Sequence, residues 1–193
     1  MPRLTALTPE QARPTARTLL AGIVERHGDA GPMVRRMAHS PALLQGYLEL
    51  SRAMKRCSVP RPLSEKISLA VQEWLDCSLC LAAHTAAGRA HGLTEPDLAL
   101  ARQGTAADAR ETALITFAMQ VLTEPAAVTD DDVAALHAYG WSDRALADVV
   151  GLVALNQLTG AFNLVAGLEA NDDEAAHPSA QYGVPPYGIV VVS

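Results

Sequence analysis

Apolar residues recur at steps of three and four along most of this chain, and that spacing marks one face of an α-helix. The pattern is clearest between residues 63 and 74, where it falls on Leu63, Ile67, Ala70, Val71 and Trp74. Pro62 stands just before it, and proline is well tolerated in the first turn of a helix. The sequence therefore predicts an all-α protein with an amphipathic helix over this segment.

Start and stop signals mark the other helices, because capping residues precede most of the apolar periods and glycine or proline follows them. They predict helices over residues 8–28, 33–38, 40–57, 94–101 and 108–123, one that opens at residue 129, and a long apolar one over residues 144–170. We accordingly divide the chain into an N-terminal helix (1–30), a helical domain (31–170) and an extended C-terminal tail (171–193). The apolar end of that tail is expected to lie against a neighbouring subunit.

The long apolar segment carries small and polar residues at intervals. Its glycines would allow close packing against another helix: Gly151, Gly160 and Gly167. Its amides are expected to hydrogen-bond between helices or to line a pocket: Asn156, Gln157 and Asn163.

Residues 64–92 bring a carboxylate, two thiols and an imidazole close together: Glu65, Cys77, Cys80 and His84. We predict that a second helix begins with Asp76 as its N-cap and ends near Gly92. The thiols and the imidazole would then share one stripe of that helix. Two Cα atoms at this spacing lie about 5–5.5 Å apart, which suits a disulfide. A thiol in the first turn should also have a lowered pKa, and Cys77 should feel this most.

If the chain reverses near Asp76, the two helices are antiparallel and Glu65 lies level with His84. Glu65 would then orient His84, and His84 would exchange a proton with Cys80. Glu73 is the competing carboxylate and is expected to be a solvated or interface acid. We assign no chemistry to His91 or His137.

Composition narrows the class of protein. The 193 residues are enough for one domain with a sizeable core, and the net charge of -6 argues against a nucleic-acid surface. The three cysteines do not suggest a secreted disulfide framework, and Cys57 is expected to be a small buried apolar residue. We find neither a signal peptide nor a stretch that reaches the length of a membrane span. These features favour a cytoplasmic protein whose CxxC pair is mainly a dithiol.

The motif E-x11-C-x2-C-x3-H, formed by Glu65, Cys77, Cys80 and His84, resembles the core of the AhpD-like alkylhydroperoxidase / carboxymuconolactone decarboxylase family. The segment SPALLQGYLEL before it is similar to the Ser-Pro helix start of that family. The helices after it also match the family's order, so the resemblance covers roughly residues 31–168.

The resemblance implies an all-helical AhpD-like fold that assembles as a homo-oligomer, a trimer or a hexamer. It implies that Cys80 attacks a hydroperoxide, that Cys77 resolves the product and meets an external dithiol reductant of thioredoxin-like or lipoyl type, and that His84 and Glu65 relay protons. No cofactor, nucleic acid or membrane is implied. Leu79 stands where the best-known redox members carry a second histidine, so the relay would be shorter. A mostly apolar pocket would favour organic hydroperoxides.

Other interpretations of the motif remain open. Zinc could use Cys77, Cys80 and His84, although structural zinc sites usually have two separated ligand pairs. A c-type haem would need histidine where Leu81 stands. The same fold could host a lyase that acts on a small lactone with His84 and Glu65 alone. A helical oligomer with only residual redox activity is a further alternative.

Overall fold

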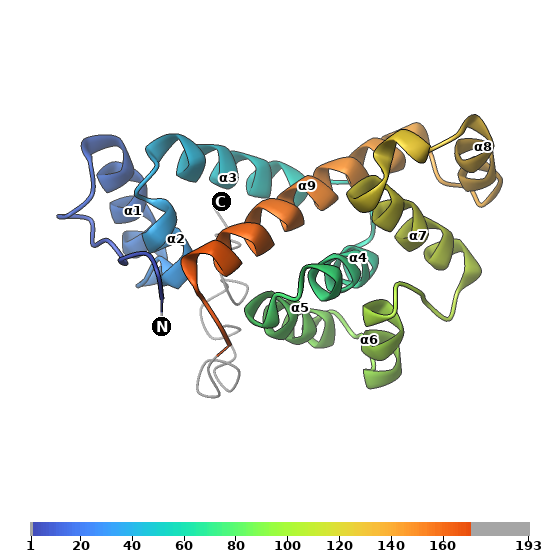
Figure 1. Ribbon diagram of the computed structural model, residues 1–193, viewed down its shortest axis with the longest axis horizontal. Helices are drawn as coiled ribbons and strands as arrows, with labels where there is room; N and C mark the ends of the chain where they lie inside the picture. Colours follow the sequence, from blue (N-terminus) through green and yellow to red (C-terminus); the bar gives the residue numbers. More distant parts are fainter. Residues whose placement is uncertain (1, 171–193) are drawn as a thin grey trace.

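The computed structural model describes residues 2–170, and this part of the chain is helical (Figure 1). The elements are α1 (Pro14–His27), α2 (Gly31–Met37), α3 (Pro41–Met54), α4 (Arg61–Leu75), α5 (Ser78–Ala90), α6 (Glu95–Arg102), α7 (Ala109–Thr123), the 3₁₀ helix η1 (Pro125–Ala127), α8 (Asp130–Ala138) and α9 (Asp143–Ala166). The predicted all-α class is therefore confirmed.

Helices α4 and α9 form the centre of the molecule. The long α9 runs diagonally across it, with α1, α2 and α3 towards one end and α7 and α8 towards the other (Figure 1). Helix α4 packs against α9 and also against α5, α6 and α7, while α9 contacts α3. These contacts place α4 inside the protein.

Two apolar clusters flank this centre. One joins α1, α2 and α3 to the C-terminal half of α9 and includes Cys77, Leu79 and Cys80. The other joins α4 to α7, α8 and the N-terminal half of α9. The cysteine pair thus lies within the core.

Most predicted helix starts are confirmed by side-chain caps. Ser40 caps α3 and Asp108 caps α7, and Thr94 and Thr129 each form a capping box with an aspartate three residues later. Helix α1 is an exception, because it begins at Pro14 and not at Thr8.

The junction between α4 and α5 differs from the prediction in one residue. Asp76 is not an N-cap: it adopts a left-handed conformation, with φ of 57°, and closes α4. Aspartate tolerates this conformation better than most residues do. The cap of α5 passes to Cys77, whose sulfur accepts a hydrogen bond from the Cys80 N–H at 3.4 Å.

Two glycines of α9 have the expected packing role. A Cβ at Gly160 would lie 2.5 Å from Gln72 Oε1, and one at Gly151 would lie 2.6 Å from the Met54 sulfur. Gly167 instead ends the helix with φ of 67°. The close approach of α9 to α4 therefore depends on Gly160.

Helix α9 contradicts the expectation that no stretch of the chain reaches the length of a membrane span. It is long and apolar enough, by length and composition, to cross a membrane, and 44% of its most apolar stretch is buried within the protein. The core helix of a water-soluble protein passes the same test, so this property is weak evidence on its own.

The predicted boundary at residue 30 stays a prediction, although α1 shares an apolar cluster with α2 and α3. The predicted tail, residues 171–193, lies outside the described residues. Trp74 corrects the predicted apolar face of α4, because 56% of its surface is exposed.

Candidate functional site

Cys77 and Cys80 form a disulfide at the start of α5, and their Cα atoms lie 5.3 Å apart. This distance agrees with the spacing predicted from the sequence. Cys77 is completely buried, whereas Cys80 keeps 5% of its surface exposed and lines a pocket. The two sulfurs are therefore not equally accessible, and only Cys80 belongs to the lining of that pocket.

The predicted pairing of Glu65 with His84 is present in the structure. The His84 Nδ1 lies 2.8 Å from Glu65 Oε2, and the Arg61 guanidinium lies 2.9 Å from Glu65 Oε1. Because a carboxylate only accepts hydrogen bonds, Nδ1 carries the shared proton. The other ring nitrogen, Nε2, is then the basic one. His84 and Cys80 line the same pocket, so the imidazole and the Cys80 side chain face one common space.

Glu65 is ionised despite its burial. Burial alone would raise the pKa of this carboxyl, but the hydrogen bond from His84 and the positive charge of Arg61 outweigh it, and the pKa is lowered. An ionised Glu65 fixes the orientation of the His84 ring.

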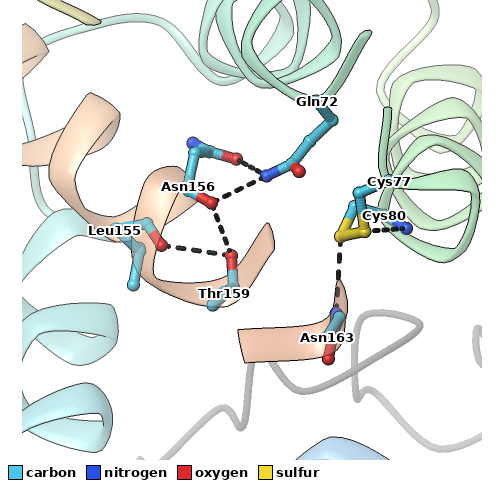
Figure 2. The surroundings of a disulfide bond; sticks show 7 residues. All are labelled: Gln72, Cys77, Cys80, Leu155, Asn156, Thr159 and Asn163. Atoms are coloured by element: carbon cyan, nitrogen blue, oxygen red, sulfur yellow. Dashed lines mark hydrogen bonds between the residues drawn. A yellow bond between two sulfur atoms is a disulfide. The ribbon is translucent and has the colours of Figure 1, made fainter. Parts of the chain in front are cut away.

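An amide from α9 contacts the disulfide. Asn163 Nδ2 lies 3.4 Å from the Cys80 sulfur, across the gap between α9 and α5 in Figure 2. The Asn163 side chain is buried, and its Oδ1 has no hydrogen-bond partner among the described residues. A donor aimed at this sulfur would stabilise a Cys80 thiolate.

A second amide network holds α4 to α9. Gln72 Nε2 donates to the Asn156 backbone oxygen and side-chain oxygen, and Asn156 Nδ2 donates to the Ser68 hydroxyl (Figure 2 shows the Gln72 contacts). The expectation that α9 amides hydrogen-bond between helices is thus confirmed for Asn156. Gln157 is exposed instead.

The pocket lies between α3, α4, α5 and α9. Its cavity volume is about 50 Å³. Apolar side chains such as Met54, Leu152 and Leu155 form part of its wall. Asn156 and Asn163 also line the pocket, which was one of the two roles expected for these amides. The other polar groups of the wall were not predicted from the sequence: Tyr47, Ser51, Lys55, Ser64, Ser68 and Thr159.

The other candidates fall outside this site. Glu73 is exposed and pairs with Arg102 at 2.7 Å. Cys57 is only half-buried, and burial raises the pKa of its thiol. Leu79 is buried in the core and is absent from the pocket lining. Between residues 2 and 170, no three His, Cys, Asp or Glu side chains gather as metal ligands.

Sequence reasoning missed two members of the site. Arg61 lies one helical turn before Glu65, and its i, i+4 spacing to that carboxylate was the available signal. Asn163 was expected to be an interhelical hydrogen-bonder, but nothing in the sequence indicates that its partner is a sulfur. Together, a sulfur redox pair, an oriented imidazole and an amide donor can support thiol chemistry.

Comparison with known proteins agrees with this geometry. Residues 41–124 match the model of the carboxymuconolactone decarboxylase family. The fold is similar to that of an alkylhydroperoxidase AhpD core, an uncharacterized peroxidase-related protein from Ralstonia eutropha JMP134. That match has 21% identity and a TM-score of 0.75, and covers 89% of this chain and 93% of that one.

Two further structures share the fold. A peroxidase-related protein from Silicibacter sp. TM1040 has 18% identity and a TM-score of 0.73, with 91% of this chain and 96% of that one covered. The debrominase Bmp8 has 18% identity and a TM-score of 0.70, with 93% and 96% covered. No curated protein matches the sequence significantly. The AhpD-like resemblance is confirmed.

Proposed function

We propose that this protein, whose residues 41–124 belong to the carboxymuconolactone decarboxylase family, is a thiol-dependent peroxidase that reduces small organic hydroperoxides. One observation carries the proposal: a cysteine of a disulfide pair shares a pocket with a histidine that a buried carboxylate orients. Redox cysteines with a resolving partner and a nearby base suit this chemistry.

The oxidative half-reaction uses both sulfurs. His84 Nε2 takes the proton of the Cys80 thiol, the resulting thiolate attacks the terminal peroxide oxygen, the O–O bond breaks, and His84 returns that proton to the alcohol that leaves. Cys80 is then a sulfenic acid. The Cys77 thiol attacks the Cys80 sulfur, water leaves, and the disulfide forms. The hydroperoxide has gained the two electrons that the two thiols have lost.

The reductive half-reaction must begin at Cys80. The resemblance implied that Cys77 meets the reductant, but the Cys77 side chain has no exposed surface in this structure. A thiol that enters the pocket reaches the Cys80 sulfur, and Cys77 becomes the leaving thiolate. The Cys80 N–H that already contacts the Cys77 sulfur would stabilise that leaving group. A second thiol of the same donor then releases Cys80. This route favours a slender lipoyl-type dithiol over a thioredoxin-like protein.

Thiol counting tests the proposal directly. The reduced protein, mixed with tert-butyl hydroperoxide, should lose two thiols for each peroxide consumed and retain Cys57. Cys80→Ser should lower the second-order rate at least about a thousandfold, because the nucleophile is gone. Cys77→Ser should still consume one equivalent and stop at the sulfenic acid, which dimedone traps. Unchanged thiols with intact peroxide would rule the proposal out.

A lyase that acts on a small lactone is the second candidate. It is supported by the family match and by the His84–Glu65 pair, which forms without help from the sulfurs. The double variant Cys77→Ser, Cys80→Ser separates the two functions, because a lyase would keep its activity and a peroxidase would lose it.

We also propose that the protein is a homo-oligomer assembled through the outer face of α9. This face carries exposed Val150, Leu164 and Val165 beside a shallow apolar groove lined by Ala154, Leu158, Ala161 and Phe162. An apolar face of this kind typically marks an interface, and the implied trimer or hexamer supplies a second copy to cover it.

A further inference from the structure

The two sulfurs of the reduced cysteine pair compete for the negative charge when the pair loses its first proton. The backbone of α5 favours Cys77, because Cys77 is the N-cap and its sulfur accepts the Cys80 N–H at 3.4 Å. Cys77, however, is completely buried, and of the two cysteines only Cys80 lines the pocket. A nucleophile at Cys80 therefore needs a hydrogen-bond donor that the start of α5 gives to Cys77 instead.

Helix α9 supplies a donor for Cys80 through Asn163. The Asn163 Nδ2 lies 3.4 Å from the Cys80 sulfur, and the Asn163 side chain is only 2% exposed (Figure 2). This contact belongs to the disulfide form. Because the hydrogen bonds of α5 fix the backbone of Cys80, the amide stays within reach of this sulfur when the pair is reduced.

The Asn163 amide differs from the other buried amide of α9 in what it contacts. Asn156 donates to the Ser68 hydroxyl and accepts from Gln72, so it holds α9 to α4. Asn163 instead meets a sulfur of α5, and its Oδ1 has no partner among the described residues. Because a buried acceptor without a partner is unfavourable and uncommon, the Asn163 amide is poorly suited to a purely structural role. Its contact with the sulfur points to a chemical one.

The titratable groups that share the pocket with Cys80 come from α3 and its C-cap, from α4 and from α5: Tyr47, Lys55, Arg61, Glu65 and His84. Helix α9 faces the pocket with uncharged residues: Leu152, Leu155, Asn156, Thr159 and Asn163. A substitution of Asn163 by an uncharged residue therefore removes a donor from the sulfur and leaves every charge around it in place.

We propose that Asn163 places the negative charge of the reduced pair on Cys80, and so makes Cys80 the nucleophile and Cys77 the resolving thiol. The different roles of the two cysteines then depend on a side chain that lies 83 residues from Cys80 in the chain. The inference rests on the proposed peroxidase function for its consequence, but the charge on each sulfur can be measured without a peroxide.

Ultraviolet absorbance of the thiolate, followed against pH, gives the midpoint of thiolate formation for each sulfur. In a Cys57→Ser background, Cys77→Ser isolates the Cys80 thiol and Cys80→Ser isolates the Cys77 thiol. Asn163→Leu keeps the approximate volume of the side chain and should raise the Cys80 midpoint by about one pH unit, as expected for a lost hydrogen bond to a charged group. The Cys77 midpoint should not change.

The matched control is Asn156→Leu, which removes a buried amide that holds α9 to α4 and should leave the Cys80 midpoint in place. Asn163→Ala guards against a leucine that crowds the pocket or prevents folding, and it should move the Cys80 midpoint in the same direction as Asn163→Leu. No shift at Cys80, equal shifts at both cysteines, or equal effects of Asn163→Leu and Asn156→Leu would overturn the inference.

A rate measurement separates this inference from the proposed function. With both redox cysteines present, Asn163→Leu should slow the consumption of tert-butyl hydroperoxide about threefold at about pH 7, because a tenfold smaller thiolate fraction is partly offset by the greater nucleophilicity of a more basic thiolate. If the midpoint shifts as expected but the wild type consumes no peroxide, the peroxidase proposal alone fails. If the variant keeps both the midpoint and the rate of a wild type that does consume peroxide, the inference about Asn163 alone fails.

Discussion

Helices α4 and α9 pack against each other, yet their surfaces are used in opposite ways. Helix α4 has ten consecutive buried residues, and half of them are polar: Ser64, Glu65, Lys66, Ser68 and Gln72. Helix α9 is the most apolar segment, but it leaves Val150, Leu164 and Val165 exposed. From hydrophobicity alone, α9 would have been expected to be the more deeply buried of the two helices.

The difference follows from the neighbours of each helix. Four other helices contact α4, and they bring partners for its polar groups, such as Glu111, which lies 2.6 Å from Lys66. The buried amides of α9 lie on its inner face, where Asn156 meets α4 and Asn163 meets α5. The buried polar residues of α4 thus coincide with the candidate functional site, and the exposed apolar face of α9 coincides with the proposed contact between copies.

The largest expected effect comes from the buried carboxylate of α4. Glu65→Gln keeps the shape of the side chain but removes the charge that orients His84, so peroxide consumption should fall at least about a hundredfold. Stopped-flow measurement of thiol loss checks this. Glu73→Gln, on the exposed side of the same helix, is the control and should change the rate little. Equal rates for the two variants would contradict the proposed role of Glu65.

The second largest effect is expected from a substitution that disturbs the packing of α9 against α4. Gly160→Ala places a Cβ against Gln72 and Leu75, so we expect the free energy of unfolding to fall by about 1–3 kcal/mol. Gly46→Ala, in the exposed middle of α3 with nothing within 4 Å, should instead stabilise by up to about 1 kcal/mol. Urea denaturation measures both changes. An unchanged free energy of unfolding in Gly160→Ala would show that the close packing of α4 and α9 at Gly160 does not contribute to stability.

Acid should remove the stabilising contribution of Glu65 in α4. The lowered pKa of Glu65 means that its ionised form stabilises the fold fully above the unfolded value of about 4.3, and that this contribution is lost as pH falls through the lower folded value. Unfolding followed between pH 6 and pH 3 should therefore show a smaller loss of stability in Glu65→Gln than in the wild type. If the free energy of unfolding fell equally with pH in the variant and the wild type, the ionised Glu65 would not contribute to stability.

A substitution on the outer face of α9 should have the smallest effect on the stability of the protomer. Val165→Asp lies on an exposed position, so the free energy of unfolding of the protomer should change by no more than about 0.5 kcal/mol. The mass in solution, measured by light scattering, should nevertheless drop to that of a smaller species. Glu25→Gln, exposed on α1, is the control and should leave the mass unchanged.

Local signals predicted the helices well, because caps such as Ser40, Thr94 and Thr129 act within one turn of chain. The Glu65–His84 pair was also predictable, since a single reversal near Asp76 brings the two residues level. Partners from distant segments were not: the contact of Asn163 with Cys80 spans 83 residues. Trp74 fitted the apolar period of α4, yet 56% of its surface is exposed.

The burial of Cys77 has a consequence for kinetics. In the proposed peroxidase cycle, the hydroperoxide and the reductant would both reach the cysteine pair through the pocket at Cys80, so neither could enter while the other is bound. The protein would then alternate between its dithiol and disulfide forms, and we expect ping-pong kinetics, in which double-reciprocal plots give parallel lines. Each co-substrate should also inhibit when it is in excess, because it then occupies the pocket in the form of the protein that reacts with the other co-substrate.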